Sequence, residues 1–75
     1  MPRKSAELTK TARAAFGRRL RKLRESRGWS QEALADKAGI SQAMLSMLEA
    51  SAKQPGWDTV QRLADALEIS VQEFR

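Results

Sequence analysis

The residue types that catalysis and metal binding use most are scarce in this sequence of 75 residues. It contains no Cys and no His, so thiolate chemistry, the commonest zinc ligands and the usual general base are all missing. A Ser-His-Asp triad is impossible, and no pair of carboxylates stands out from ordinary helix-surface charge. We therefore expect no enzyme, no metal and no cofactor. Because disulfides are also impossible, the composition suits a reducing compartment.

The chemistry that remains is recognition by charge and by hydrogen bonds. Residues 1–27 hold ten Arg or Lys against Glu7 and Glu25, whereas residues 28–75 hold four basic residues against seven acidic ones. A basic block beside a mildly acidic body is typical of a chain that contacts nucleic acid or an anionic membrane. The block could equally be the solvated face of a helix, so charge alone leaves these interpretations open.

The elements that must position such a surface are helical, because apolar residues recur at helical spacing and alternating β-branched runs are absent. We expect one all-α domain over residues 12–75, with five helices and no strands. A basic arm over residues 1–11, partly disordered, is expected before it. The first helix covers about 12–27 and ends at Gly28. Its apolar stripe consists of Phe16, Leu20 and Leu23. The later helices are expected to follow Ser30, Ser41, the turn at 52–57 and Ser70.

The stretch AGIS, residues 38–41, separates two short helices and predicts a helix-turn-helix. Gly39 lies just past the last apolar position of the earlier helix, where helices often end in the left-handed conformation that Gly adopts without a Cβ penalty. Ile40 then turns inward and Ser41 caps the next helix, while Ala35 is small where the helices cross. In this motif the first helix supports the second, which projects from the surface. The buried positions around the turn are expected to be Leu34, Ala38, Ile40, Leu45 and Leu48.

These residues resemble the Cro/repressor-type helix-turn-helix family, also called the xenobiotic-response-element family. The likeness runs from about Phe16 to Phe74 and includes FGRRLRKLRESRG, WSQEALADKAGIS, LSMLEAS and QPGWDTVQRLADALEIS, in family order and spacing. The resemblance implies a lambda-repressor-like fold of five helices, in which the third helix enters the major groove of DNA, and dimers on palindromic operators. One departure is Ser51, which stands where the family usually has Gly.

The resemblance also implies roles for individual residues. Gln31, at the start of the second helix, would contact a phosphate, and Gln42, at the start of the third, would meet base edges. Lys53 and the backbone amides of residues 51–57 would hold the far phosphate strand. The rest of the DNA-binding set is Ser41, Ala43, Met44, Ser46 and Met47.

Other residues are expected to support the third helix or a dimer. Family members with the pair formed here by Arg24 and Glu49 join it in a partly buried salt bridge. The full supporting set is Arg24, Glu49, Ala35 and Gly39. Trp29 and Trp57 flank the central helices and are expected to complete the core. The residues that could serve either the core or a dimer are Val60, Leu63, Leu67, Ile69, Val71 and Phe74. Of these, the interface is expected around Ile69, Val71 and Phe74.

Met44 and Met47 leave three interpretations open. They lie opposite Leu45 and Leu48 on the third helix, so we expect them on the surface. They could contact thymine methyl groups, cover a dimer or partner contact, or be surface residues without a role.

We interpret the chain as a sequence-specific double-stranded DNA-binding regulator. The expected form is a homodimeric repressor on a palindromic operator, in the cytoplasm of a bacterium or encoded by a phage. No apolar run approaches the ~20 residues that cross a bilayer, so no membrane contact is expected. The alternative from another class is a protein-interaction module, such as an antitoxin-like partner binder that uses the Met-rich face. A basic membrane-surface helix is disfavoured, because the apolar stripe of the first helix is needed for the core.

Overall fold

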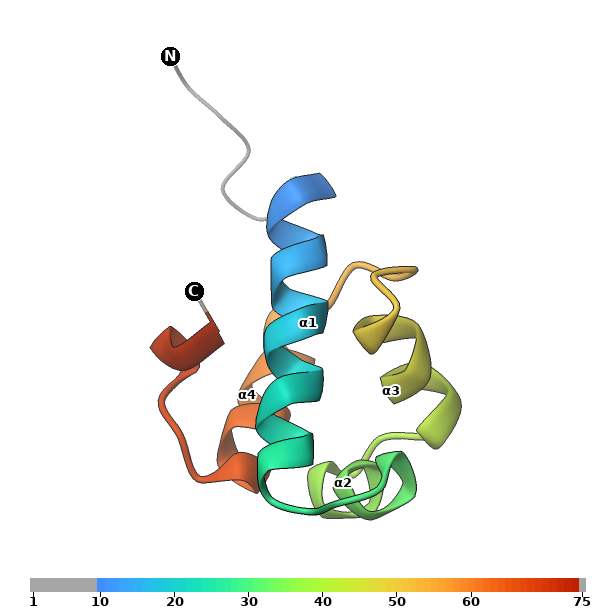
Figure 1. Ribbon diagram of the computed structural model, residues 1–75, viewed down its shortest axis with the longest axis vertical. Helices are drawn as coiled ribbons and strands as arrows, with labels where there is room; N and C mark the ends of the chain where they lie inside the picture. The colour runs from blue at the N-terminus through green and yellow to red at the C-terminus, as the bar shows by residue number, and fades with distance from the viewer. Residues whose placement is uncertain (1–9, 75) are drawn as a thin grey trace.

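Four α-helices and one short 3-10 turn form the part of the chain that the structure describes, residues 10–74 with side chains from residue 12 (Figure 1). The elements of this computed structural model are α1 over Lys10–Ser26, α2 over Gln31–Ala38, α3 over Gln42–Glu49, α4 over Trp57–Leu67 and η1 over Val71–Phe74. These residues contain no strand, so the expected all-α class is confirmed. The expected count of five α-helices is wrong, because the four residues of η1 complete only a 3-10 turn.

The helix ends follow from local backbone chemistry. Ser30 Oγ accepts the Ala33 N–H at 3.1 Å, and Ser41 Oγ accepts the Met44 N–H at 3.0 Å, so each serine caps the helix that follows it. Gly39 ends α2 in the left-handed region with φ of 72°. The predicted break between α2 and α3 is therefore confirmed. The expected arm over residues 1–11 lies outside the described residues, except that its last two residues form the start of α1.

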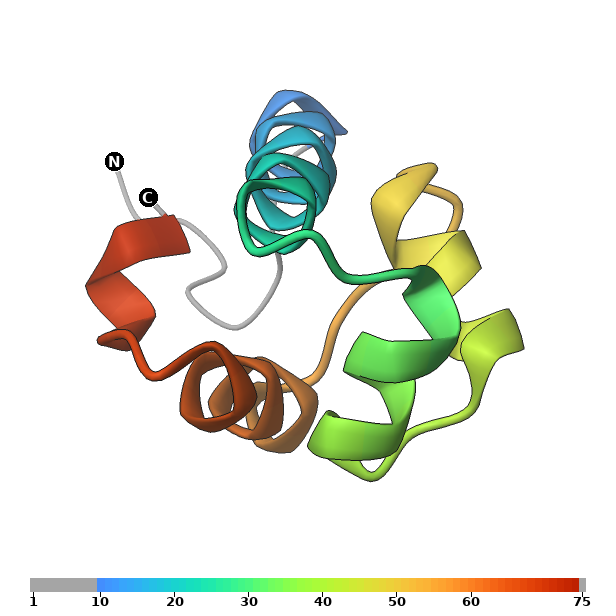
Figure 2. The same cartoon turned by 60° about the horizontal axis from the view of Figure 1, so that its bottom comes forward.

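The helices surround one core. In Figure 1, α1 runs the length of the molecule, and both Figures 1 and 2 show α3 on one side of it and η1 on the other. α2 packs against both α3 and α4, and η1 contacts both α1 and α4. The buried apolar residues are Phe16, Leu20, Leu34, Ala35, Ala38, Leu45, Leu48, Leu63, Ala64, Leu67 and Phe74. None of the helices in residues 10–74 has the length and apolarity that crossing a membrane requires.

At Gly17, α1 lies close against the backbone at the end of α3. A Cβ added there would lie 2.7 Å from the Leu48 carbonyl oxygen and 2.8 Å from that of Glu49. These are backbone atoms at the end of α3, which cannot swing aside as a flexible side chain can. The absence of a side chain at Gly17 therefore sets how closely α3 lies against α1, a contact that the sequence did not predict.

The structure corrects the expected places of two aromatic residues. Trp57 was expected in the core, but it is 68% exposed. It precedes Leu63 by six residues, so it lies about 240° around α4 from that buried side chain. Phe74 was expected at a dimer interface, but it is only 7% exposed. The η1 turn carries its ring to within 5.0 Å of the Phe16 ring, measured between centroids, where it closes the core of its own chain.

Candidate nucleic-acid interface

The outer face of α3 carries a group of uncharged and accessible side chains. Leu45 and Leu48 are buried and anchor the inner face of the helix. The exposed residues of the predicted DNA-binding set on or next to α3 are Ser41, Gln42, Ala43, Ser46 and Met47. Met47 is 42% exposed, which is unusual for a large apolar residue in this fold. The helix therefore presents one amide, two hydroxyls and apolar groups, without any ionised side chain among them.

Met44 does not belong to this exposed face. It was expected opposite Leu45 and Leu48, but it is half-buried and packs against the core. The physical reason is helical spacing: residues four apart lie on the same face, so Met44 sits beside Leu48 rather than opposite it. Met47 alone remains as an accessible methionine of α3.

Arg24 and Glu49 join α1 to the end of α3. Arg24 Nε donates to Glu49 Oε2 at 2.7 Å, and Arg24 Nη2 donates to Glu49 Oε1 at 3.0 Å. The salt bridge that the resemblance implies is therefore present, and its geometry is two-pronged. The two side chains are only 11% and 4% exposed. Arg24 Nη1 also donates to the Trp29 carbonyl at 2.8 Å. The hydrogen bond to Glu49 raises the pKa of the Arg24 guanidinium despite the opposing effect of burial, so Arg24 stays charged.

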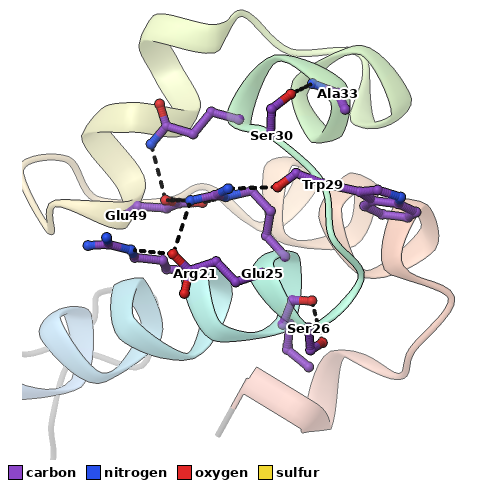
Figure 3. A network of polar contacts seen from close by, with 10 residues as sticks. Arg21, Glu25, Ser26, Trp29, Ser30, Ala33 and Glu49 are labelled. Atoms are coloured by element: carbon purple, nitrogen blue, oxygen red, sulfur yellow. Dashed lines mark hydrogen bonds and ion pairs between the residues drawn. The ribbon is translucent and has the colours of Figure 1, made fainter.

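A polar network extends from this ion pair to α2 (Figure 3). Gln31 Nε2 donates to Glu49 Oε1 at 3.1 Å. On the solvent side, Arg21 donates to Glu25 at 3.1 Å, and Arg24 Nη2 lies 3.9 Å from the same carboxylate. The predicted phosphate ligand Gln31 is thus half-buried and already hydrogen-bonded to α3. No sequence pattern indicated this contact, which joins residues 18 apart.

The loop between α3 and α4 uses part of its backbone internally. Amides of residues 51–57 were expected to hold phosphate, but Ser51 N–H donates to the Leu48 carbonyl and Ala52 N–H to the Met47 carbonyl. These two amides satisfy the end of α3, as a C-terminal cap requires. Ser51 has φ of 63°, in the left-handed region that favours Gly, the residue that the resemblance leads us to expect at this position. Lys53 is exposed beyond this cap and stays a candidate.

The C-terminal residues expected at a dimer interface are divided by the structure. Ile69 and Val71 are half-buried and pack at the edge of the core. Phe74 belongs inside the chain, as described above. Ile69 and Val71 thus remain the candidates for contact with a second copy.

The arrangement is suited to recognition of a surface. It offers hydrogen-bonding and apolar groups on a helix that is fixed to its neighbours. The residues that the structure describes contain no group of three or more His, Cys, Asp or Glu placed to hold a metal ion.

Comparisons with known proteins agree with this geometry. Residues 15–75 match the model of a protein family that is described as a helix-turn-helix domain. The HTH-type transcriptional regulator YazB of Bacillus subtilis is 38% identical over 59 residues, which are 79% of this chain and 86% of that protein. Other relatives are longer, and the chain spans 31% of the length of one and 22% of another.

Solved structures show the same fold. The restriction-modification controller protein C.AhdI from Aeromonas hydrophila superposes with a TM-score of 0.84 at 32% identity, over 87% of this chain and 98% of that one. SinR of Bacillus subtilis is a master regulator for biofilm formation that was solved in complex with DNA. It superposes with a TM-score of 0.75 at 28% identity, over 79% of this chain and 95% of that one. From the match over residues 15–75 and the YazB likeness, the chain belongs to the helix-turn-helix domain family of transcriptional regulators.

Proposed function

We propose that this chain binds double-stranded DNA sequence-specifically, as a transcriptional repressor, with α3 in the major groove. The observation that carries the proposal is the outer face of α3: the helix is anchored by Leu45 and Leu48 and presents uncharged side chains to solvent. A helix of this kind fits the major groove, where base edges are accessible. The relative solved in complex with DNA, SinR, has the same fold.

The side chains of this face match particular base edges. The amide of Gln42 carries an acceptor and two donors, which pair with the N7 and N6 groups of adenine. Ala43 and Met47 are exposed and apolar, so they can contact the methyl group of thymine. Arg and Lys, which favour guanine, and Asp and Glu, which favour cytosine, are absent from the exposed residues of α3. We therefore expect the contacted bases to be rich in A·T pairs.

Phosphate contacts would supply most of the affinity. Gln31 lies in the first turn of α2, where the helix dipole and the free N–H groups favour an anion, and Lys53 lies beyond the end of α3. Ser41 fixes the start of α3 through its cap, so that Gln42 enters the groove first. The basic residues of α1 add general attraction to DNA.

A dimer would double the contacts of this small domain. Two copies related by a two-fold axis would place α3 in successive turns of the major groove, about 34 Å apart, on a palindromic operator. Ile69 and Val71 are the apolar residues at the edge of the core that could meet a second copy.

The test is selection of bound duplexes from a random DNA pool, followed by footprinting of the enriched sequence. We expect an inverted repeat with half-sites one turn apart and a footprint over both. Enrichment of single half-sites, with binding linear in protein concentration, would contradict the dimer. No enrichment at all would contradict sequence-specific binding and would favour the protein-interaction alternative, in which Met47 contacts a partner.

A further inference from the structure

We propose that Glu49 is a positioning residue, which orients the side chain of Gln31 for its contact with a DNA phosphate. The carboxylate of Glu49 on α3 would thus hold Gln31, the residue of α2 that contacts the DNA backbone, in a fixed position relative to the helix that contacts the bases. The inference rests on the proposed DNA-binding function.

The contacts of the Glu49 carboxylate carry this inference. Its Oε2 accepts from Arg24 Nε at 2.7 Å, and its Oε1 accepts from Arg24 Nη2 at 3.0 Å and from Gln31 Nε2 at 3.1 Å. The side chain is 4% exposed, so water competes little for these oxygens. The two hydrogen bonds from Arg24 fix the plane of the carboxylate, and the carboxylate in turn fixes the amide of Gln31.

The bond to Glu49 leaves the Gln31 amide able to do a second task. A Gln side chain has two N–H donors and one carbonyl acceptor, and one donor serves Glu49. The second hydrogen of Nε2 can therefore reach a phosphate oxygen without breaking the internal bond. A free Gln side chain would lose rotamer entropy on binding DNA, whereas this one is already held before DNA arrives.

Arg24 makes a carboxylate acceptable so close to DNA. An unpaired negative charge beside a phosphate would repel it, and the repulsion grows as water is excluded. Arg24 balances the charge of Glu49 through two hydrogen bonds, so the pair presents no net charge to the backbone. The ion pair thus has a consequence for binding as well as for stability.

The first measurement uses the unmodified chain. In ¹⁵N-labelled protein, heteronuclear relaxation of the Gln31 side-chain amide should show restricted motion in the absence of DNA. The amide of Gln72, an exposed residue of η1, is the mobile reference. In a Glu49→Asp variant, whose shorter side chain withdraws from α2, the Gln31 amide should become as mobile as that of Gln72. Equal mobility of the two amides in the unmodified chain would overturn the inference.

The second measurement is a double-mutant cycle on binding to a selected and a random duplex at one salt concentration. Gln31→Met and Glu49→Asp should each weaken binding to both duplexes about fivefold, the value of one ordinary hydrogen bond. If Glu49 acts through Gln31, the double variant should be no weaker than the weaker single variant, within about twofold.

Multiplying losses, about 25-fold in the double variant, would show that Glu49 acts independently of Gln31 and would overturn the inference. Binding unaffected by Gln31→Met would overturn it as well. Failure of the unmodified chain to bind any duplex would instead refute the proposed function, and the amide relaxation would still decide whether Glu49 holds Gln31.

Discussion

Removal of the Glu49 carboxylate is expected to destabilise the whole domain. In Glu49→Ala, Arg24 loses both prongs of its ion pair and keeps the Trp29 carbonyl at 2.8 Å and the carboxylate of Glu25 at 3.9 Å. Arg24 is 11% exposed, so solvent cannot replace what is lost. Breaking a buried pair from one side costs about 3–5 kcal/mol, against a total stability of roughly 4–11 kcal/mol for a domain of this length.

The assay is thermal unfolding followed by circular dichroism. A loss of 3–5 kcal/mol corresponds to a fall in Tm of at least about 12 °C for a domain of this size. The matched control is Glu25→Ala, which removes the same charge from the exposed side of Arg24 and should cost less than about 1 kcal/mol. A Tm for Glu49→Ala within about 4 °C of the unmodified chain, or equal falls for both variants, would refute the argument from burial.

Three further predictions test other parts of the fold by the same unfolding measurement. Glu68 ends α4 with φ of 59°, so Glu68→Gly should raise stability by about 1 kcal/mol. Ser51→Gly should gain less, because Ser51 has φ of 63° but also a hydroxyl bonded to the backbone of α1. A loss of stability in Glu68→Gly would contradict backbone strain at Glu68. Gly17→Ala forces a Cβ against the end of α3. It should lower stability by about 1–2 kcal/mol, because the cost of overpacking exceeds the gain in helix propensity. An increase in Tm would show that α3 can move aside. Trp57→Ala should change stability by less than about 0.5 kcal/mol, as substitutions of exposed residues do. Trp29→Ala should destabilise the domain clearly more, because Trp29 is half-buried. The reverse order would contradict the burial of Trp29 and the exposure of Trp57.

Local rules explain why so much of the α2–α3 arrangement could be predicted. Ser30, Gly39 and Ser41 act through backbone atoms within a few residues, so their types alone indicate where the helices begin and end. The observed caps at 3.1 Å and 3.0 Å, and the φ of 72° at Gly39, follow these rules. Arg24 and Glu49 are 25 residues apart, and only the resemblance to a family indicated that they would meet.

The errors arose where angles around a helix or long-range packing decide the outcome. Trp29 and Trp57 are the same residue type, yet Trp29 packs against the core and Trp57, at the start of α4, is exposed. Met44 lies on the same side of α3 as Leu48, four residues on, and is therefore half-buried rather than exposed. Phe74 could be assigned to the core only once η1 was seen to return to α1.

The bond between Gln31 and Glu49 had no local signal either. It depends on the crossing angle of α2 and α3, which no pattern of residue types specifies. It also changes how Gln31 is understood: the side chain is held within the fold and is not a free group at the start of a helix.

The binding of Gln42→Ala to DNA tests most directly whether α3 recognises bases. Affinities for a selected duplex and for a random duplex would be measured by fluorescence anisotropy at one salt concentration, with Gln61→Ala, an exposed position on α4, as the control. Because Gln42 is the only exposed amide on α3, its loss should weaken binding to the selected duplex by about 1–3 kcal/mol and relax the preference at one position per half-site. Binding to random DNA, which depends on phosphates, should hardly change. Equal losses on both duplexes would mean that Gln42 contacts the backbone or nothing, and would contradict base recognition by α3.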